Sequence, residues 1–451
     1  MPRKRLFPIS QRAGNYKIML LNLIKKGGLP GSFALLISIG TLLLMLPGVC
    51  TRDLTLVDAF FTACSAVCLN GLAVVGTWEF TFFGQLIILI LIQLGCFGIL
   101  SLSAIILLLA GKELSLSETL IMYNLNDRFS LGCTESLLRT IATYTLVCEA
   151  IGAVLMLPGF ILNGFGFLPS LWYSLFYSVG SFCNAGIGPL AGDIAAAGRY
   201  VQVISLALIF LGGLGVYVIY DLLQILHNRN HHMRLHSRIV LKCCAVLIVS
   251  GTLSLFLISM LPGGGNLHLF DAFYLSITSR TAGYSTVDLS RLSPACLTLI
   301  IVLMLIGGSP GSTAGGLKTT TLAVIFAALA SSFKGDNAVI ISGRTVALRT
   351  VLRSFTIAVM FILIVVFGGL LLSAVSPQLT DRQCFFEVSS ALGGTGLDAG
   401  WITPQLTGPC KLMVAFFMFL GRVGPLAVFM FFVRKEKPAV LHYPEERVIV
   451  G

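Results

Sequence analysis

Eight long apolar stretches run through the chain and decide what it can fold into. They lie at about residues 31–50, 83–110, 138–162, 200–226, 239–261, 295–330, 346–375 and 410–433. Each is long enough for a helix that crosses a bilayer, which needs about 20 apolar residues. Because backbone in hydrocarbon must satisfy its own polar groups, such stretches form helices. The sequence therefore predicts an all-α polytopic protein embedded in a lipid bilayer.

The composition and the charge pattern support this class. Hydrophobic residues make up 56% of the chain and charged residues only 11%, which excludes an ordinary soluble domain. The net charge of +11 comes from basic residues dispersed among apolar stretches, so nucleic acid is not indicated as a partner. Twenty-two Lys and Arg lie in the amino-terminal segment, the even-to-odd connections and the carboxyl tail, against six in the other connections. The richer side is expected to be cytoplasmic, with both termini on it.

The four connections on the opposite side carry more acids than bases. Nine carboxyl groups are expected there: Asp53, Asp58, Glu79, Asp193, Asp271, Asp288, Asp381, Glu387 and Asp398. Their excess over six bases predicts a mild attraction for cations. For any single one of them, a solvated position without a function is an equally good interpretation.

The same four regions share a repeated pattern, in which Phe is followed ten residues later by Gly. The four copies are "FTACSAVCLNGL" (61–72), "FYSVGSFCNAGI" (176–187), "FYLSITSRTAGY" (273–284) and "FEVSSALGGTGL" (386–397). A GxxG pair follows each copy inside the next apolar stretch. These echoes indicate an internal fourfold repeat. The expected units are residues 31–110, 138–226, 239–330 and 346–433, with cytoplasmic segments at 1–30 and 434–451.

Each repeated segment is too short to cross a bilayer, and it ends in a glycine. Non-helical backbone survives at membrane depth only where protein or water surrounds it. We expect a short helix of about two turns, followed by a strip that the glycine allows to bend. Four strips around one axis would form rings of carbonyl oxygens that replace the hydration shell of a cation. The alternative is four re-entrant loops that only plug the interior.

The sixth apolar stretch contains a run of small and polar residues, "GGSPGSTAGGLKTTT" (307–321). Pro310 lacks a backbone donor and the glycines weaken a helix, so a loop that interrupts the span is expected. A kinked packing helix is the alternative. Lys318 and Arg422 are basic residues within apolar stretches, and such charges normally face a cavity or a partner. Lys318 could instead extend to the cytoplasmic surface.

Four segments carry a resemblance to a known family. "SAVCLNGL", "ITSRTAGYSTVDL", "IGGSPGSTAGGLKTTT" and "FLGRVGPL" resemble signature stretches of the potassium-transporter superfamily that includes bacterial Trk, Ktr and plant HKT proteins, and in particular the KtrB branch. The resemblance covers about residues 30 to 433. It implies a potassium-channel-like fold around a pseudo-fourfold pore, and potassium uptake across the bacterial cytoplasmic membrane. It also implies one glycine per filter strip, from which weaker exclusion of sodium is a hypothesis.

The resemblance assigns candidate residues to the filter and the gate. The implied potassium-binding strips are Cys68, Leu69, Asn70 and Gly71; Cys183, Asn184, Ala185 and Gly186; Arg280, Thr281, Ala282 and Gly283; and Gly393, Gly394, Thr395 and Gly396. Arg280 fits a strip only if its side chain points away from the ion. The implied gate consists of Gly308, Ser309, Pro310, Gly311, Ser312, Thr313, Ala314, Gly315, Gly316 and Lys318, with Arg422 in the pore, contacting the loop and repelling cations.

No nucleotide-binding fingerprint occurs in the sequence, so no cofactor is expected in this chain and potassium is expected as the transported ion. The resemblance implies a homodimer and a separate cytosolic KtrA-type ring that binds ATP or ADP. Three other readings stay open. One is a membrane-embedded enzyme, although Ser309 and Ser312 lack suitably spaced partners and the cluster at His227, His231, His232 and His236 is basic and polar. The others are a TrkH-type transporter and a sodium-coupled carrier, for which Glu149 is the candidate acid. No enzymatic activity is expected.

Overall fold

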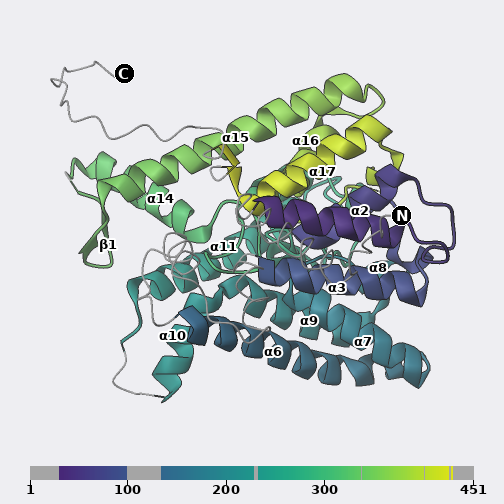
Figure 1. Cartoon of the computed structure of the whole chain (residues 1–451). Coiled ribbons are helices and arrows are strands. Elements are labelled where there is room, and N and C mark those ends of the chain that lie inside the picture. Colours follow the sequence, from purple (N-terminus) through teal and green to yellow (C-terminus); the bar gives the residue numbers. More distant parts are fainter. Residues whose placement is uncertain are drawn as a thin grey trace, which may run out of the picture.

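The computed structural model describes residues 30–98, 134–227, 232–336, 338–400, 402–425 and 428–429. The expected cytoplasmic segment up to residue 29, the end of the second apolar stretch and the tail 434–451 lie outside these residues. The part that is described is helical apart from one two-stranded hairpin, formed by β1 (Ile340–Ile341) and β2 (Arg344–Thr345). The long helices lie side by side with roughly parallel axes (Figure 1).

A long helix, a short re-entrant helix and a further helix follow one another four times. The first two units contain a helix at Pro30–Leu44, α2 (Leu56–Cys68), η1 (Thr77–Glu79) and α3 (Phe82–Gly98), then α6 (Thr134–Leu162), α7 (Phe167–Phe182), α8 (Asp193–Ala196), α9 (Gly198–Leu214) and α10 (Val216–His227). The last two contain α11 (Leu235–Ser259), α12 (Leu269–Thr278), η3 (Leu289–Arg291), α13 (Pro294–Leu305) and α14 (Thr319–Lys334), then α15 (Leu348–Val375), α16 (Asp381–Gly393), η4 (Thr403–Gln405) and α17 (Gly408–Val423).

Three of these helices, α6, α11 and α15, contain segments long and apolar enough to cross a membrane by themselves. Their outward faces carry exposed Leu, Val and Ile, for example Val154, Leu257 and Leu370. Such exposed apolar faces suit contact with lipid rather than water. The chain is thus a multi-pass helical membrane protein, and the predicted fold class is confirmed.

The fourth apolar stretch differs from its prediction as one continuous span over 200–226. Helix α9 ends at Leu214, and α10 starts at Val216 after a bend of 97°. The bend is at Gly215, whose φ of 80° and ψ of 151° lie outside the helical region. Figure 1 shows α10 turning away from the direction of α9.

The four short helices are longer than the two turns predicted from the Phe-to-Gly pattern. They are α2, α7, α12 and α16, and each begins before its repeat phenylalanine. Capping explains two of the early starts: Thr55 accepts a hydrogen bond from the backbone of Asp58, and Thr380 forms a capping box with Gln383.

The re-entrant helices are buried mainly over their second halves, next to the strips that follow them. Phe61, Phe176 and Phe386 of the repeat are fully buried, whereas Phe273 is 36% exposed. In three of the four units, the repeated spacing therefore places a large apolar side chain inside the protein core. These anchors fix where the strip that follows each helix begins.

Candidate ion pathway

The four strips meet in a closed ring. A side-chain carbon added to the repeat glycine of each strip would lie closer than 3.0 Å to a carbonyl oxygen of the next strip. In every case this carbonyl belongs to the residue just before the glycine. The contacts run from Gly71 to Ala185, from Gly186 to Ala282, from Gly283 to Thr395, and from Gly396 back to Asn70. Quasi-equivalent carbonyl groups from all four repeats are thus gathered around one axis.

Only glycine suits these four ring positions. Their φ angles are 102°, 63°, 72° and 80°, in the region that other residues rarely adopt. The close neighbours are backbone atoms, which cannot move aside as the end of a flexible side chain can. A side chain at a ring glycine would therefore strain its own backbone and displace the adjacent strip.

The polar side chains of two strips point into the protein around the ring. The Asn70 amide donates to the carbonyls of Ala391, at 2.8 Å, and Ser390, at 3.3 Å, near the end of α16. The Asn184 amide donates to the Thr313 hydroxyl at 2.7 Å. Both asparagines are fully buried. The main chain is therefore the part of these strips that is left to meet an ion.

Arg280 lies in the third strip, but its side chain leaves the ring. It lines a cavity of about 10 Å³ together with Phe210 of α9, Cys244 of α11 and Ile277 of α12. This direction is the one that a filter strip requires of an arginine.

In three repeats, the first glycine of the GxxG pair allows a close contact between two backbones. A side-chain carbon at the first glycine of the pair would lie closer than 3.0 Å to a carbonyl near the end of the preceding re-entrant helix. These contacts join Gly95 to Val67, Gly212 to Phe182, and Gly421 to Leu392. Glycine thus allows the second helix of these units to touch the base of the strip backbone to backbone. In the third repeat the pair Gly308/Gly311 lies in a loop instead.

This loop separates α13 from α14 and spans residues 306–318, close to the predicted interruption at 307–321. Its two ends pair in parallel at Ile306 and Leu317. The loop docks on the break between α9 and α10: Ser309 N donates to Gly213 O at 3.2 Å and Val216 N donates to Gly311 O at 3.2 Å. The last carbonyls of a helix lack hydrogen-bond donors within the helix, and here the loop supplies a donor.

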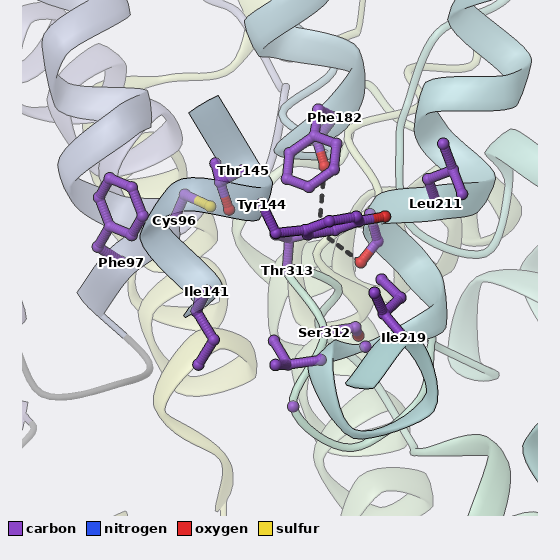
Figure 2. A pocket seen from close by; sticks show the side chains of 14 residues that line it. Cys96, Phe97, Ile141, Tyr144, Thr145, Phe182, Leu211, Ile219, Ser312 and Thr313 are labelled. Atoms are coloured by element: carbon purple, nitrogen blue, oxygen red, sulfur yellow. Dashed lines mark hydrogen bonds between the residues drawn. The ribbon is translucent and has the colours of Figure 1, made fainter. Parts of the chain in front are cut away.

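The other side of the loop touches the strips from below. A side-chain carbon at Gly315 would lie 2.8 Å from the Gly393 carbonyl of the fourth strip. The Thr313 hydroxyl lies 3.4 Å from the Phe182 carbonyl and 3.3 Å from the Gly212 carbonyl, both shown dashed in Figure 2. The loop therefore lies directly against the base of the second and fourth strips.

A cavity of about 30 Å³ lies beside the loop (Figure 2). Gly311, Ser312 and Thr313 form one wall, and α3, α6, α9 and α10 form the others. Tyr144 of α6 reaches into this space next to the ring of Phe182, at a centroid distance of 5.6 Å. The volume matches that of about one water molecule, so it leaves the loop a small space into which it can shift.

Two basic side chains hold the loop. The Arg422 guanidinium is buried and donates to the carbonyls of Thr313 in the loop and of Gly95 in α3, the latter at 2.8 Å. The Lys318 ammonium donates to the Ala314 carbonyl at 2.6 Å and is half-buried. Lys318 therefore turns back onto the loop.

Four of the nine acids expected on the outer side are paired with bases. Four ion pairs are Arg52–Glu79 (3.3 Å), Lys411–Asp58 (2.8 Å), Arg199–Asp271 (2.6 Å) and Arg291–Asp288 (3.3 Å). Hydrogen bonds from the hydroxyl and backbone N–H of Ser290 lower the pKa of Asp288 below its usual value, so this exposed carboxylate is ionised at neutral pH. Pairing makes the attraction for cations weaker than the formal charges predict.

Sequence reasoning missed two features beside the ring. Glu149, named above as the candidate acid of a sodium-coupled carrier, is buried and touches the second strip: Gln93 donates to it at 3.2 Å and the Cys183 thiol at 3.5 Å. Glu387 and Asp398 flank the fourth strip, and both accept hydrogen bonds from Thr403. A carboxyl group in an otherwise apolar repeat was the available signal in both places, but its partner could not be read from the sequence.

A ring of carbonyl-bearing strips above a small polar loop, inside a helical membrane protein, defines a pore-loop cation transporter. Comparison with known proteins agrees: residues 28–443 match the family described as TrkH, cation transport protein, and the chain belongs to this family. The resemblance noted from the sequence is thereby confirmed.

Several relatives match over nearly their whole length. The chain is 35% identical to the potassium/sodium uptake protein NtpJ of Enterococcus hirae, over 100% of this chain and 98% of the relative. It is 31% and 33% identical to the Ktr system potassium uptake protein B of Bacillus subtilis and of Vibrio alginolyticus, over at least 93% of each chain. The crystal structure of the potassium transporter TrkH from Vibrio parahaemolyticus has the same fold, with a TM-score of 0.70 at 18% identity over 96% of this chain and 87% of that one.

Proposed function

We propose that this chain is the pore-forming subunit of a Ktr-type system that takes up potassium across the bacterial cytoplasmic membrane. The observation that carries the proposal is the closed ring of four glycines and four carbonyl groups. Carbonyl oxygens can replace the hydration shell of an alkali cation without fixed negative charge. The identity of the ion is inferred from the relatives, since those that are 31–35% identical are named as potassium or potassium/sodium uptake proteins.

The loop at 306–318 is proposed as the gate. It lies at the base of the strips, and it is rich in residues that change conformation at little cost. Arg422 holds the loop to α3 and places a positive charge beneath the ring. Opening would require the loop to leave this position, for which the adjacent cavity offers some room.

The expected partners are also proposals. A homodimer and a cytosolic nucleotide-binding ring follow from similarity to proteins named as components of a Ktr system. In this assembly, ATP or ADP would act through the cytosolic regulatory partner, and both termini of the present chain would be cytoplasmic. Size-exclusion chromatography with light scattering on the purified protein tests the dimer, and reporter fusions to the carboxyl terminus test the orientation.

The filter is tested by rubidium uptake into bacterial cells that lack their own potassium transporters, measured with and without excess sodium. Gly71→Ser places a side chain against the Ala185 carbonyl and the Gly186 backbone, closer than the neighbours permit. We expect the variant to lose discrimination against sodium by about tenfold, which corresponds to about 1.4 kcal/mol.

Gly48→Ala provides the matched control. Gly48 also has a positive φ, of 82°, but among the described residues nothing lies within 4 Å of an added carbon. It therefore carries the backbone strain of Gly71→Ser without the contact at the ring. If both variants discriminate as the unsubstituted protein does, the ring is not the selective element; if both lose discrimination equally, strain rather than the ring is responsible.

A further inference from the structure

The fourth strip is flanked by a buried and a half-buried carboxyl group that the filter and gate do not use. Glu387 lies on α16, nine residues before the ring glycine Gly396, and Asp398 lies two residues after it. The two carboxyl groups meet at Thr403, whose backbone N–H donates to Asp398 at 3.2 Å and whose hydroxyl donates to Glu387 at 3.1 Å. Together they join the helix before the strip to the backbone after it, directly behind the ring.

The hydrogen bonds around the pair are unequal. Asp398 accepts from two backbone groups, Ile402 N at 2.9 Å and Thr403 N at 3.2 Å. Glu387 is completely buried and accepts only from the Thr403 hydroxyl, at 3.1 Å, through Oε2. Its Oε1 is buried without a partner among the described residues. The surroundings therefore stabilise a carboxylate at Asp398 and leave Glu387 poorly solvated.

A positive charge that could neutralise both acids is not found in the described surroundings of the pair. The helices packed against α16 are α13, α15 and α17. The thiols on these helices are Cys296, Cys410 and, on α16 itself, Cys384. The bases have other places or partners: Arg349 and Arg353 lie at the opposite end of α15, Lys411 is paired with Asp58, and Arg291 is exposed and paired with Asp288. Arg422 of α17 donates to the carbonyls of Thr313 and Gly95, and Asp381 and Arg382 are exposed on the first turn of α16. Two adjacent ionised carboxylates would repel one another strongly in such a site.

The second repeat shows what an equivalent contact looks like with a neutral donor. Tyr177 occupies the position nine residues before its ring glycine, Gly186, and its hydroxyl donates to Asp193 at 3.1 Å. A side-chain carbon at Gly188, two residues after Gly186, would meet both groups of this pair. A hydroxyl–carboxylate hydrogen bond thus lies behind the second strip, at the place that Glu387 and Asp398 occupy behind the fourth.

We propose that Glu387 and Asp398 share one proton, and that the resulting carboxylic acid–carboxylate hydrogen bond positions the fourth strip and helps to set discrimination between potassium and sodium. The proton lies between the two groups, with Glu387 as the donor and Asp398 as the acceptor. The two acids then titrate as a unit. Loss of the proton at alkaline pH replaces an attraction by a repulsion, which loosens the strip. This inference rests on the proposed function of the ring.

The test is rubidium uptake into proteoliposomes that contain the full chain, with and without excess sodium, from pH 6 to pH 9.5. We expect the discrimination of the unsubstituted protein to fall by about tenfold toward the alkaline end, the effect of losing one net hydrogen bond. Glu387→Gln keeps a donor that does not titrate, so its discrimination should equal the neutral-pH value across the range. Glu387→Ala should be poorly selective at every pH.

Tyr177→Phe is the matched control, because it removes the equivalent donor of the second repeat without touching the acid pair. We expect it to lower discrimination at every pH while keeping the alkaline decline. The inference is overturned if Glu387→Gln shows the same decline as the unsubstituted protein, or if Glu387→Gln is as unselective as Glu387→Ala at neutral pH. A selective protein at pH 7 with a flat pH profile would refute the shared proton and leave the proposed function intact.

Discussion

Arg422 offers the sharpest test of how the loop is held. Its guanidinium donates to Thr313 in the loop and to Gly95 in α3, so one side chain ties the proposed gate to a fixed helix. Arg422→Ala removes both contacts and the charge. We therefore expect the variant to take up rubidium faster than the unsubstituted protein when no regulatory partner is present.

The size of the effect follows from the two hydrogen bonds. A hydrogen bond from a charged group contributes about 1.5–3 kcal/mol, so the pair stabilises the closed loop by about 3 kcal/mol even at the low end. An energy of about 3 kcal/mol changes an equilibrium by about 100-fold, since each 1.4 kcal/mol is tenfold. If the loop of the unsubstituted protein is open about 1% of the time, loss of the two hydrogen bonds raises the open fraction to about one half. Uptake then rises by about 50-fold.

Two further substitutions separate the tie from the charge. Arg422→Lys keeps the charge but offers a point donor instead of a planar fork, so it should retain one contact and give an intermediate rate. Arg422→Gln removes the charge and keeps a short donor. The assay is initial rubidium uptake into proteoliposomes, normalised to the amount of protein. Equal rates in the Ala variant and the unsubstituted protein would refute the tie; equal rates in the Gln and Ala variants, with Lys unchanged, would assign the effect to charge alone.

Two predictions concern the packing around the pathway. Gly215→Ala should lower the thermal unfolding temperature of the purified protein and raise basal rubidium uptake. The reason is that the added carbon would lie 2.5 Å from Ser309 Oγ and 2.7 Å from the Pro310 carbonyl, at a φ of 80°. Gly164→Ala is the control, because Gly164 has a φ of 88° and among the described residues nothing lies within 4 Å of an added carbon. Lys411→Met should destabilise the protein by about 1–3 kcal/mol, because it leaves the half-buried Asp58 carboxylate without its basic partner. In a thermal unfolding assay, the double variant with Asp58→Asn should recover part of this loss. No recovery would mean that the ion pair contributes little to stability.

The ring was predictable because its cause is local. A phenylalanine that anchors a short helix and a glycine that permits a bend must keep a fixed spacing, and four copies of that spacing are visible without any structure. The loop in the sixth stretch was predictable for a similar reason, since proline and five glycines within fifteen residues oppose a continuous helix. Both features depend on residues that are neighbours in sequence.

The break at Gly215 was not predictable from the same kind of pattern. Its GxxG pair has counterparts in the other repeats that behave differently from one another: α3 extends to Gly98, whereas α17 ends at Val423, directly before Gly424. What distinguishes Gly215 is the loop that reaches it from about one hundred residues further along the chain. The acid pair behind the fourth strip was also missed, because the spacing of Glu387 and Asp398 in the sequence does not indicate that they lie close together.

The broken fourth stretch and the interrupted sixth stretch are best understood as one feature. Each alone would leave helix-end carbonyls or loop N–H groups without partners inside a membrane protein, at a cost of about 1–3 kcal/mol for each group. Together they satisfy one another, through Ser309 N on Gly213 O and Val216 N on Gly311 O. A filter needs four similar strips, whereas a gate that one loop operates needs the symmetry to fail. The chain keeps the symmetry as far as the ring glycines and abandons it at the third GxxG pair, which is why selection and gating can lie so close together on one axis.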